Sequence, residues 1–319
     1  MPFESIDPYD FFAPNNEDRQ TKHRRMFMYS VDAIRAAVKL ERVFVNHSAA
    51  RDALHAMDRV YQLGRDIGLP QGVILMGPPG SGKSTLFSYF SESLPKEEIL
   101  DSDCRVIAIR LQKRPSLSRI VATMLKQIRY PLPATRDSNV SIKKDLLLEG
   151  MRQKGSRLIL IDEAHHLFGY HNRKSACNSG NEITDLIRES MDVTSAAVVL
   201  AGSTELDDLD SFDAHLAGRI TARIQLKNYG DDATTWAGVV GAIVRDFKEV
   251  DLKGLVTPAG LASLNVATSG NLRSLKRILT EAVMIVIDEA KSSIDTNHLA
   301  LAFERVRGVD CPQSNPYAR

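Results

Sequence analysis

One stretch constrains the fold of this chain more than any other, because nine residues rich in glycine and small polar side chains stand between two apolar segments. The stretch consists of Gly77, Pro78, Pro79, Gly80, Ser81, Gly82, Lys83, Ser84 and Thr85. The apolar run at 72–76 predicts a strand, and the segment at 86–90 predicts a helix. In that context the glycines let backbone N–H groups surround phosphates, Lys83 reaches the β and γ oxygens, and the Ser84 hydroxyl binds Mg²⁺. We therefore expect an ATP and Mg²⁺ site at the positive end of the helix.

The composition is that of a globular protein of about two domains, since 319 residues with 43% apolar side chains can bury a large core. The formal net charge is +1, so any DNA-binding surface must be local and built from clustered Lys and Arg. The cysteines are far apart and odd in number, as is typical of a reducing compartment; they are Cys104, Cys177 and Cys311. We see neither a leader segment nor an apolar run of about 18 residues, and expect a cytoplasmic protein.

The first 29 residues are polar and lack periodicity, which predicts an arm that is either disordered or ordered only against a partner or DNA. Ser30 is the expected N-cap of a helix that runs to about Val43. Ser48 is the expected cap of a second helix, and Gly68 is expected to end it.

After the glycine loop, apolar runs alternate with helical segments, a pattern that favours a parallel sheet with crossover helices. A helix is predicted at 116–128. The predicted strands span 72–76, 105–111, 158–161 and 196–201, with 223–226 as a candidate fifth.

From about residue 231 the strand patterns stop and only helical stripes remain, one between Trp236 and Phe247 and another between Leu272 and Val286. Asp295 is the expected cap of a last helix. We therefore predict an α/β ATPase core with a central parallel sheet, followed by a small all-helical lid. The C-terminal tail is either a docking peptide or a frayed end. The expected boundaries are 1–43 for the arm and first helix, 44–230 for the core, 231–308 for the lid and 309–319 for the tail.

Two acidic residues follow the apolar run at 158–161. At the carboxyl end of a buried strand, Asp162 is placed to hold Mg²⁺ through its water shell and Glu163 to act as general base on water. The alternative is that the two acids form a turn with no catalytic role. The predicted phosphate-binding loop in the same chain argues against that alternative.

Histidines follow the acidic pair directly and raise the question of a second metal. The spacing of His165, His166, His171 and Cys177 matches no common zinc pattern, and imidazoles at such a place are more often hydrogen-bonded helix residues. We expect no zinc site here.

Three polar positions further along occur in the order that a ring-forming ATPase requires. Ser203 or Thr204, after the run at 196–201, is a candidate to orient the attacking water. Arg219 precedes the candidate fifth strand and is a candidate to reach the γ-phosphate held by a neighbouring subunit. Arg273 opens a lid helix and is a candidate to sense the nucleotide of its own subunit. Either arginine alone is more often a solvated surface residue, and it is their order along the chain that favours these two roles.

With these residues in place, the chain resembles the AAA+ ATPases over about residues 40–308. The resemblance assigns Walker A to 77–84, Walker B to 158–163 and sensor 1 to the region of Ser203. It assigns an arginine finger to Arg219, with Arg223 as a competitor because both flank the same strand entry, and sensor 2 to Arg273.

Within that superfamily the chain looks most like the TniB and TnsC transposition ATPases, on the phrases at 161–167, 199–206, 269–275 and 314–317. The resemblance implies that ATP-bound subunits assemble on duplex DNA as a ring or helical filament. It further implies that they recruit a transposase and a target-selection protein and disassemble on ATP hydrolysis.

A filament of that kind needs basic side chains that hold phosphates without reading bases. Gln112, at the end of the second predicted strand, is a candidate to relay DNA contact to Glu163. The basic candidates follow the second strand and the acidic pair, and are Lys113, Arg114, Arg119, Arg173 and Lys174.

Proteins of two other functional classes have the same ATPase core. A helicase loader or replication initiator often carries a winged-helix domain, for which we expect little room after the lid. A nucleotide-switched signalling scaffold would hydrolyse ATP slowly and ignore DNA, and the complete acidic pair argues against it.

Overall fold

The computed structural model describes residues 29–94, 104–130, 140–170, 179–230, 232–308 and 311–318. The predicted arm therefore lies outside the described residues, apart from Tyr29. Within these ranges, no helix combines the length and the apolar character that crossing a membrane requires.

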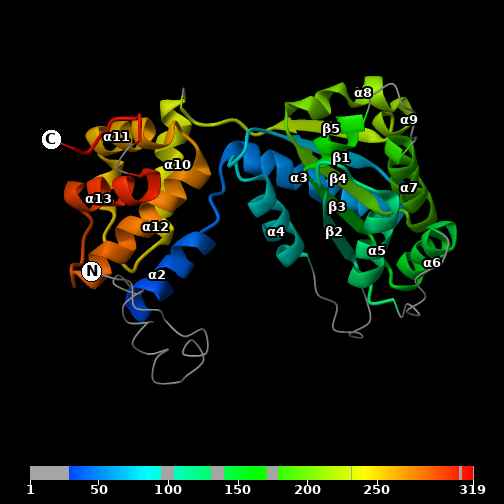
Figure 1. The fold of residues 1–319 in the computed structure, drawn as a ribbon, viewed down its shortest axis with the longest axis horizontal. Coiled ribbons are helices and arrows are strands. Elements are labelled where there is room, and N and C mark those ends of the chain that lie inside the picture. Colours follow the sequence, from blue (N-terminus) through cyan, green and yellow to red (C-terminus); the bar gives the residue numbers. More distant parts are fainter. Residues whose placement is uncertain are drawn as a thin grey trace, which may run out of the picture. The chain divides into compact units, whose positions relative to one another are not determined.

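Five strands form one sheet in the order β2-β3-β4-β1-β5, and every neighbouring pair is parallel (Figure 1). Because the strands are parallel, their carboxyl ends lie at one edge, where the glycine loop follows β1 and the acidic pair ends β3. The predicted parallel sheet with crossover connections is confirmed. The strands are β1 (Gly72–Met76), β2 (Val106–Arg110), β3 (Leu158–Asp162), β4 (Ala197–Gly202) and β5 (Ile220–Gln225).

The predicted bounds hold to within one residue for the first four strands, but β5 begins three residues before the predicted 223–226. β5 lies at an edge of the sheet, and its half-buried Ile220, Ala222 and Ile224 alternate with exposed side chains. An edge strand of this kind lacks the continuous apolar run that marks a strand buried on both faces.

Helices cover both faces of the sheet, which explains why its central strands are apolar without alternation (Figure 1). Val73 and Leu75 of β1 join the apolar side chains of α3 and α4 on one face. Ile74 and Met76 join those of α5, α6 and α7 on the other. The first seven α-helices in the described ranges are α2 (Val31–Arg42), α3 (Ser48–Gln62), α4 (Lys83–Ser93), α5 (Leu117–Gln127), α6 (Val140–Gln153), α7 (Ser179–Thr194) and α8 (Leu209–Phe212). The later ones are α9 (Ala214–Ala217), α10 (Ala233–Asp246), α11 (Pro258–Thr268), α12 (Leu272–Asp288) and α13 (Thr296–Arg307).

Most of the helix caps are the residues that the sequence predicted. Ser30 caps α2, with its hydroxyl accepting from the Ala33 N–H at 3.1 Å, and Gly68 ends the turn after α3 with a φ of +70°. The prediction that Ser48 caps α3 is wrong. The cap is His47, whose Nδ1 accepts from the Ala50 N–H at 3.2 Å, because a histidine ring can supply the acceptor that a hydroxyl usually provides.

The chain divides into two compact units. The larger contains Phe44–Asp246 and Leu255–Leu275, and so includes the sheet, its covering helices, α10, α11 and the first turn of α12. The smaller contains Met1–Val43, Phe247–Gly254 and Lys276–Arg319. The four-part division predicted from the sequence stays a prediction.

Within the smaller unit, both ends of the described chain are fixed by polar contacts. The Tyr29 hydroxyl donates to Glu281 and accepts from Arg305 Nη1 at 2.7 Å. In the tail, Asn315 Nδ2 donates to the Ala300 carbonyl of α13 at 3.0 Å, and Tyr317 is buried. The tail residues at 311–318 thus pack against their own chain rather than fraying. Asp295 caps α13 as predicted, in a capping box with His298.

Candidate nucleotide site

The glycine loop turns the chain from β1 into α4 at the carboxyl edge of the sheet. Gly80 and Gly82 have φ of +83° and +99°, a left-handed conformation that glycine adopts without a Cβ penalty. α4 begins at Lys83, and the first N–H groups of a helix have no partner inside the helix. Among the described residues, the buried Ser81 hydroxyl also has no hydrogen-bond partner. These donors and the helix dipole fit an anion such as a nucleotide phosphate.

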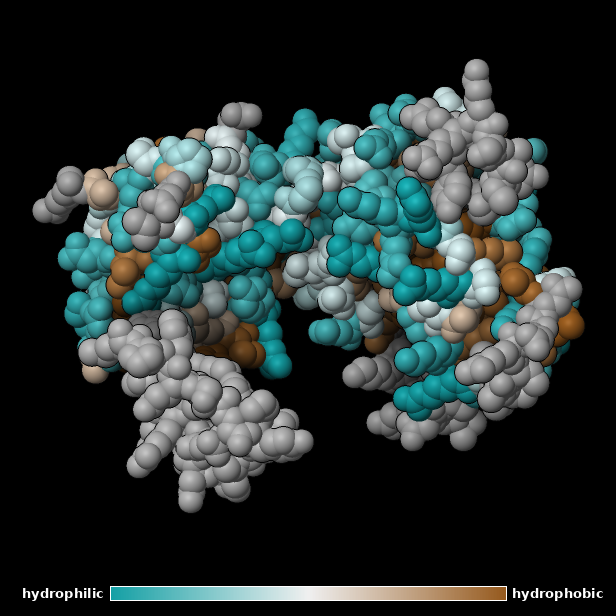
Figure 2. Space-filling view, viewed as in Figure 1, coloured by the Kyte–Doolittle hydropathy of each residue, from teal (hydrophilic) through white to brown (hydrophobic). Residues whose placement is uncertain are grey.

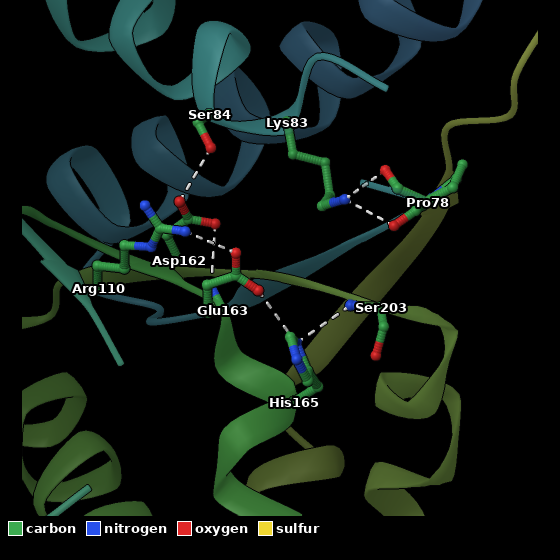
Figure 3. A network of polar contacts seen from close by, with 9 residues as sticks. Pro78, Lys83, Ser84, Arg110, Asp162, Glu163, His165 and Ser203 are labelled. Atoms are coloured by element: carbon green, nitrogen blue, oxygen red, sulfur yellow. Dashed lines mark hydrogen bonds and ion pairs between the residues drawn. The ribbon is translucent and has the colours of Figure 1, made fainter. Parts of the chain in front are cut away.

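Lys83 lies against this loop. Its Nζ donates to the carbonyl oxygens of Gly77 at 2.6 Å and Pro78 at 3.0 Å (Figure 3). Burial lowers the pKa of Lys83, the carboxylates of Glu163 and Asp162 act to raise it, and the charge of Arg273 acts to lower it. Charged phosphate oxygens are stronger acceptors than neutral carbonyls, so the ammonium is placed to exchange one for the other.

Ser84 joins the glycine loop to the acidic pair. Its hydroxyl donates to the Asp162 Oδ2 at 2.9 Å, between residues 78 positions apart in the sequence (Figure 3). Hydroxyl and carboxylate oxygens are the ligands that Mg²⁺ takes in phosphate-binding sites. The donor set therefore fits the predicted Mg²⁺, with Ser84 and Asp162 as the residues that would hold it.

Glu163 follows with a φ of +55°, a left-handed conformation that costs a residue with a Cβ about 1–3 kcal/mol. Its N–H donates to the Asp162 Oδ1 at 2.9 Å, which helps to hold the turn. The Glu163 carboxylate lies between two other groups: Arg110 Nη2 is 3.0 Å from its Oε1, and His165 Nδ1 is 3.5 Å from its Oε2 (Figure 3). The strained turn thus directs the candidate base into a polar cluster.

The structure distinguishes the two sensor candidates at the end of β4. The Ser203 N–H donates to the His165 Nδ1 at 3.3 Å, and the Ser203 hydroxyl is a buried atom without a partner among the described residues. Thr204 is exposed and begins a short 3₁₀ turn, Thr204–Asp208. In Figure 3 the Ser203 hydroxyl points away from Lys83, so a χ1 rotation is needed to turn it toward a phosphate.

Arg110 is the partner of Glu163 that sequence reasoning missed. The structure places Arg110 there rather than Gln112, because Gln112 accepts instead from Arg119 at 2.7 Å. β2 and β3 pair with Arg110 opposite Asp162, which puts the arginine beside the next residue, Glu163. The only signal in the sequence was a basic residue at the end of a predicted strand.

The backbone of Arg273 lies beside the glycine loop within the larger unit, since its N–H donates to the Gly80 carbonyl at 3.2 Å. Its neighbour Asn271, which the sequence did not single out, donates from Nδ2 to the Pro79 carbonyl at 2.9 Å. The sensor-2 candidate is therefore next to the loop that it was expected to monitor.

Arg219 lies where the strands have their amino-terminal ends, opposite the ends that carry the glycine loop. There its carbonyl accepts the Gly72 N–H at 2.8 Å. About 13 Å of strand separates these amino-terminal ends from the glycine loop. Its guanidinium pairs with Asp192, with Nη2 3.0 Å from Oδ2. Arg223, opposite Ile74 on β5, pairs instead with two other carboxylates, Asp207 at 3.2 Å and Asp210. Both finger candidates are thus held by carboxylates of their own chain.

The basic candidates Lys113, Arg114 and Arg119 are exposed, on the segment that leaves β2 and in the first turn of α5. The Leu111 N–H donates to the Asp162 carbonyl at 2.9 Å, so this segment starts beside the acidic pair. Arg173 and Lys174 lie outside the described residues.

Glu163, His165 and His166 also bring possible metal-ligating atoms within 4.8 Å of one another. His165 Nδ1, however, already accepts the Ser203 N–H. His171 and Cys177 lie outside the described residues.

Several solved structures share this fold. The Aeropyrum pernix ORC2 protein in its ADPNP–ADP complexes is 14% identical, with a TM-score of 0.59, and the match covers 80% of this chain and 67% of that one. Cdc6p from Pyrobaculum aerophilum is 16% identical, with a TM-score of 0.57 and coverages of 83% and 69%. Drosophila ORC bound to DNA is 15% identical, with a TM-score of 0.57 and coverages of 91% and 73%. At these identities the likeness establishes the fold alone, which is the AAA+ fold predicted from the sequence.

No sequence match was found among curated proteins. The family model described as "Bacterial TniB protein" matches residues 35–230, a segment that contains the glycine loop, the acidic pair and all five strands. Since that segment is well over half of the chain, the protein belongs to the TniB family.

Proposed function

We propose that this TniB-family protein is an Mg²⁺-dependent ATPase that assembles on duplex DNA and regulates transposition. The observation that supports the proposal most directly is the hydrogen bond between Ser84 and Asp162, beside Glu163. It brings a phosphate loop, a pair of metal ligands and a candidate base into one site, which is what phosphoryl transfer to water requires.

In the proposed reaction, Lys83 and the loop N–H groups bind the β- and γ-phosphates of ATP. Mg²⁺, when bound by Ser84 and Asp162, would neutralise charge on the phosphate oxygens. Glu163 accepts the proton of the water that attacks the γ-phosphorus, and the products are ADP and phosphate. Arg110 occupies the Glu163 Oε1, so water reaches that oxygen only when the ion pair opens, whereas Oε2 faces His165.

Assembly is proposed to complete the site. Arg219 is too far along the sheet to reach its own glycine loop, so its role in catalysis requires a neighbouring subunit. Large apolar side chains are exposed on segments near this edge: Ile67 and Leu69 precede β1, and Val193 follows Asp192, the partner of Arg219. Exposed apolar groups of this kind favour an interface, here with a second copy of the chain.

DNA binding is proposed at the carboxyl edge, where Arg110, Lys113, Arg114 and Arg119 are exposed beside the nucleotide site. Figure 2 shows mostly hydrophilic residues on the face it presents, with apolar ones between them. Basic side chains next to Glu163 would let phosphate contact alter the rate of hydrolysis. One similar solved structure, the Aeropyrum pernix ORC1 protein, is in complex with DNA, which is consistent with a DNA-facing AAA+ core.

TniB membership supports the proposed role in transposition. We propose that the ATP-bound ring or helical filament recruits a transposase and a target-selection protein in the cytoplasm, and that hydrolysis disassembles it.

Electron microscopy of the protein with duplex DNA tests the proposal. ATP, or an analogue that is hydrolysed slowly, should give rings or filaments on the DNA, whereas ADP or the Lys83→Ala variant should not. Monomers alone in the presence of ATP and DNA would contradict the proposal.

A replication initiator or helicase loader is the second candidate, favoured by the likeness to ORC and Cdc6 structures. Pull-down of a replicative helicase by the ATP-bound protein, without capture of the transposase of the same element, would favour it over a transposition regulator.

A further inference from the structure

His165 stands between the ends of two strands that the proposed reaction needs together. Its Nδ1 is 3.3 Å from the Ser203 nitrogen, after β4, and 3.5 Å from the Glu163 Oε2, after β3 (Figure 3). The His165 side chain is only 17% exposed. A single ring nitrogen thus faces both the candidate base and the candidate sensor.

The close packing at the end of β4 fixes this ring. A Cβ at Gly202 would lie 3.0 Å from both the His165 N and its Nδ1, tighter than ordinary van der Waals contact. Glycine at this position therefore allows the histidine to approach the backbone of β4. Nothing in the sequence indicated this contact, since His165 and Gly202 are far apart in the chain.

The direction of the hydrogen bond defines the tautomer. The Ser203 N–H is a donor, so Nδ1 accepts with its lone pair and the ring proton lies on Nε2. With Nδ1 unprotonated, its 3.5 Å contact with the Glu163 Oε2 joins two acceptors and is not a hydrogen bond. The Ser203 bond and the packing against Gly202 hold the ring in this place.

We propose that His165 is a positioning residue: by accepting the Ser203 N–H at Nδ1, it holds the end of β4, and with it the candidate sensor Ser203, in place beside the Glu163 carboxylate. This inference rests on the proposed ATPase function. It predicts that the loss of Nδ1 slows turnover without weakening nucleotide binding, because His165 has no contact with the glycine loop or Lys83 among the polar contacts of the described site.

Two amide substitutions separate this role from simple space filling. The amide oxygen of Asn lies near the position of Nδ1, so His165→Asn keeps the acceptor for Ser203. The amide of Gln lies near the position of Nε2, so His165→Gln loses that acceptor while it keeps the polarity and bulk. His166→Asn is the matched control, because His166 lies in the same turn and against the same ring but is not the partner of Ser203.

The experiment measures kcat, KM and the Kd of a fluorescent ATP analogue for all three variants, together with their thermal unfolding. His165→Gln should lower kcat by about 10- to 100-fold, as expected for a misplaced catalytic group, with the Kd within about twofold of the native protein. His165→Asn and His166→Asn should stay within about threefold in kcat. Equal losses in His165→Gln and His165→Asn, or no loss in either, would overturn the inference.

Hydrogen exchange at the Ser203 amide supplies a readout that does not depend on activity. Exchange should be faster in His165→Gln than in the native protein and in His165→Asn, and equal rates in all three would overturn the contact. A native protein without ATP turnover would instead refute the proposed function, so the two failures are distinguishable.

Discussion

Arg110, the last residue of β2, donates from Nη2 to the Glu163 Oε1 at 3.0 Å. The pairing of β2 with β3 sets this contact, because Arg110 lies directly opposite Asp162. The Arg110 side chain is 72% exposed, so an anion in solution can compete for it. The ion pair therefore connects an exposed basic edge to the candidate base.

Removing this guanidinium should release the base. We expect Arg110→Ala to raise the DNA-free ATPase rate by about two- to fivefold, the effect of an exposed ion pair worth up to about 1 kcal/mol. Stimulation by duplex DNA should shrink, since phosphates would no longer act by drawing Arg110 from Glu163. Arg119→Ala, whose guanidinium bonds Gln112, is the control and should keep the native DNA-free rate. A lower DNA-free rate in Arg110→Ala would refute this account.

Substitutions at Lys83 and Glu163 should affect different steps, with Lys83 needed for ATP binding and Glu163 for hydrolysis. Lys83→Ala should lose ATP binding in a fluorescent-analogue titration. Glu163→Gln should bind ATP within about threefold of the native Kd and turn over about 10²- to 10⁴-fold more slowly, the usual contribution of a general base. Glu205→Gln, at a nearby exposed acid, should turn over normally. Normal phosphate release by Glu163→Gln would remove the assigned base.

The arginine finger can be identified by mixing subunits. Arg219→Ala alone should lose about 10³-fold in turnover, the lower end for an arginine finger. Glu163→Gln subunits still bind ATP and carry Arg219. When they are mixed with Arg219→Ala subunits, they should supply Arg219 to the ATP sites of those subunits, which keep Glu163, and so restore hydrolysis there. If Arg223→Ala is complemented in this way and Arg219→Ala is not, Arg223 is the finger.

Duplex binding should depend on salt through the exposed basic residues. We expect Lys113→Ala and Arg114→Ala to weaken binding to all DNA sequences alike, and each to reduce the slope of log K against log salt by about 1. Fluorescence anisotropy at several salt concentrations measures the slope. Lys253→Ala, at an exposed lysine far along the chain, is the control and should keep the native slope. An unchanged slope in both loop variants would remove this loop from the DNA surface.

His47 predicts a pH dependence of stability. Burial, with a smaller effect of the Arg51 charge, lowers the pKa of His47 to about 4, against about 6.5 in an unfolded chain. The unfolded state therefore binds more protons between these values, so this contribution to stability is complete above pH 6.5 and is lost as the pH falls toward 4. Protonation at Nδ1 would also break the bond from the Ala50 N–H.

Urea unfolding at pH 7.5 and pH 5 measures this effect. His47→Asn keeps an acceptor for the Ala50 N–H but does not titrate, so its stability should fall less between the two pH values than that of the native protein. His55→Asn, at an exposed position on the same helix, should keep the native difference. A native-like difference in His47→Asn would contradict the assignment.

The sequence predicted the parts of the site that are local. The glycine loop and the acidic pair each occupy a few consecutive residues after an apolar run, and a parallel strand buried on both faces is visible as such a run. The bounds of β1, β3 and β4 followed for that reason, and those of β2 followed because this edge strand also has a continuous apolar run, at 106–109. β5 was placed three residues late because its apolar side chains alternate with Thr221 and Arg223 on a sheet edge.

The side chains around the base were not predictable in the same way. Gln112 was expected to contact Glu163, but strand register gave that place to Arg110, two residues earlier. The contacts of His165 with Ser203 and of Asn271 with Pro79 likewise join residues from separate elements. Each depends on which strands and turns become neighbours.

The sequence by itself determined which groups this protein can bring to a site: a glycine-rich loop, a candidate Mg²⁺-binding pair, a candidate base and the order of the trailing arginines. Only the tertiary structure decided how they meet. It brought Ser84 into contact with Asp162, and Arg110 and His165 into contact with Glu163. It placed Arg219 at the amino-terminal ends of the strands. The physical reason is that hydrophobic periodicity specifies which residues are buried in each element, whereas strand order and register, set by the packing of all elements together, specify which of their ends come into contact.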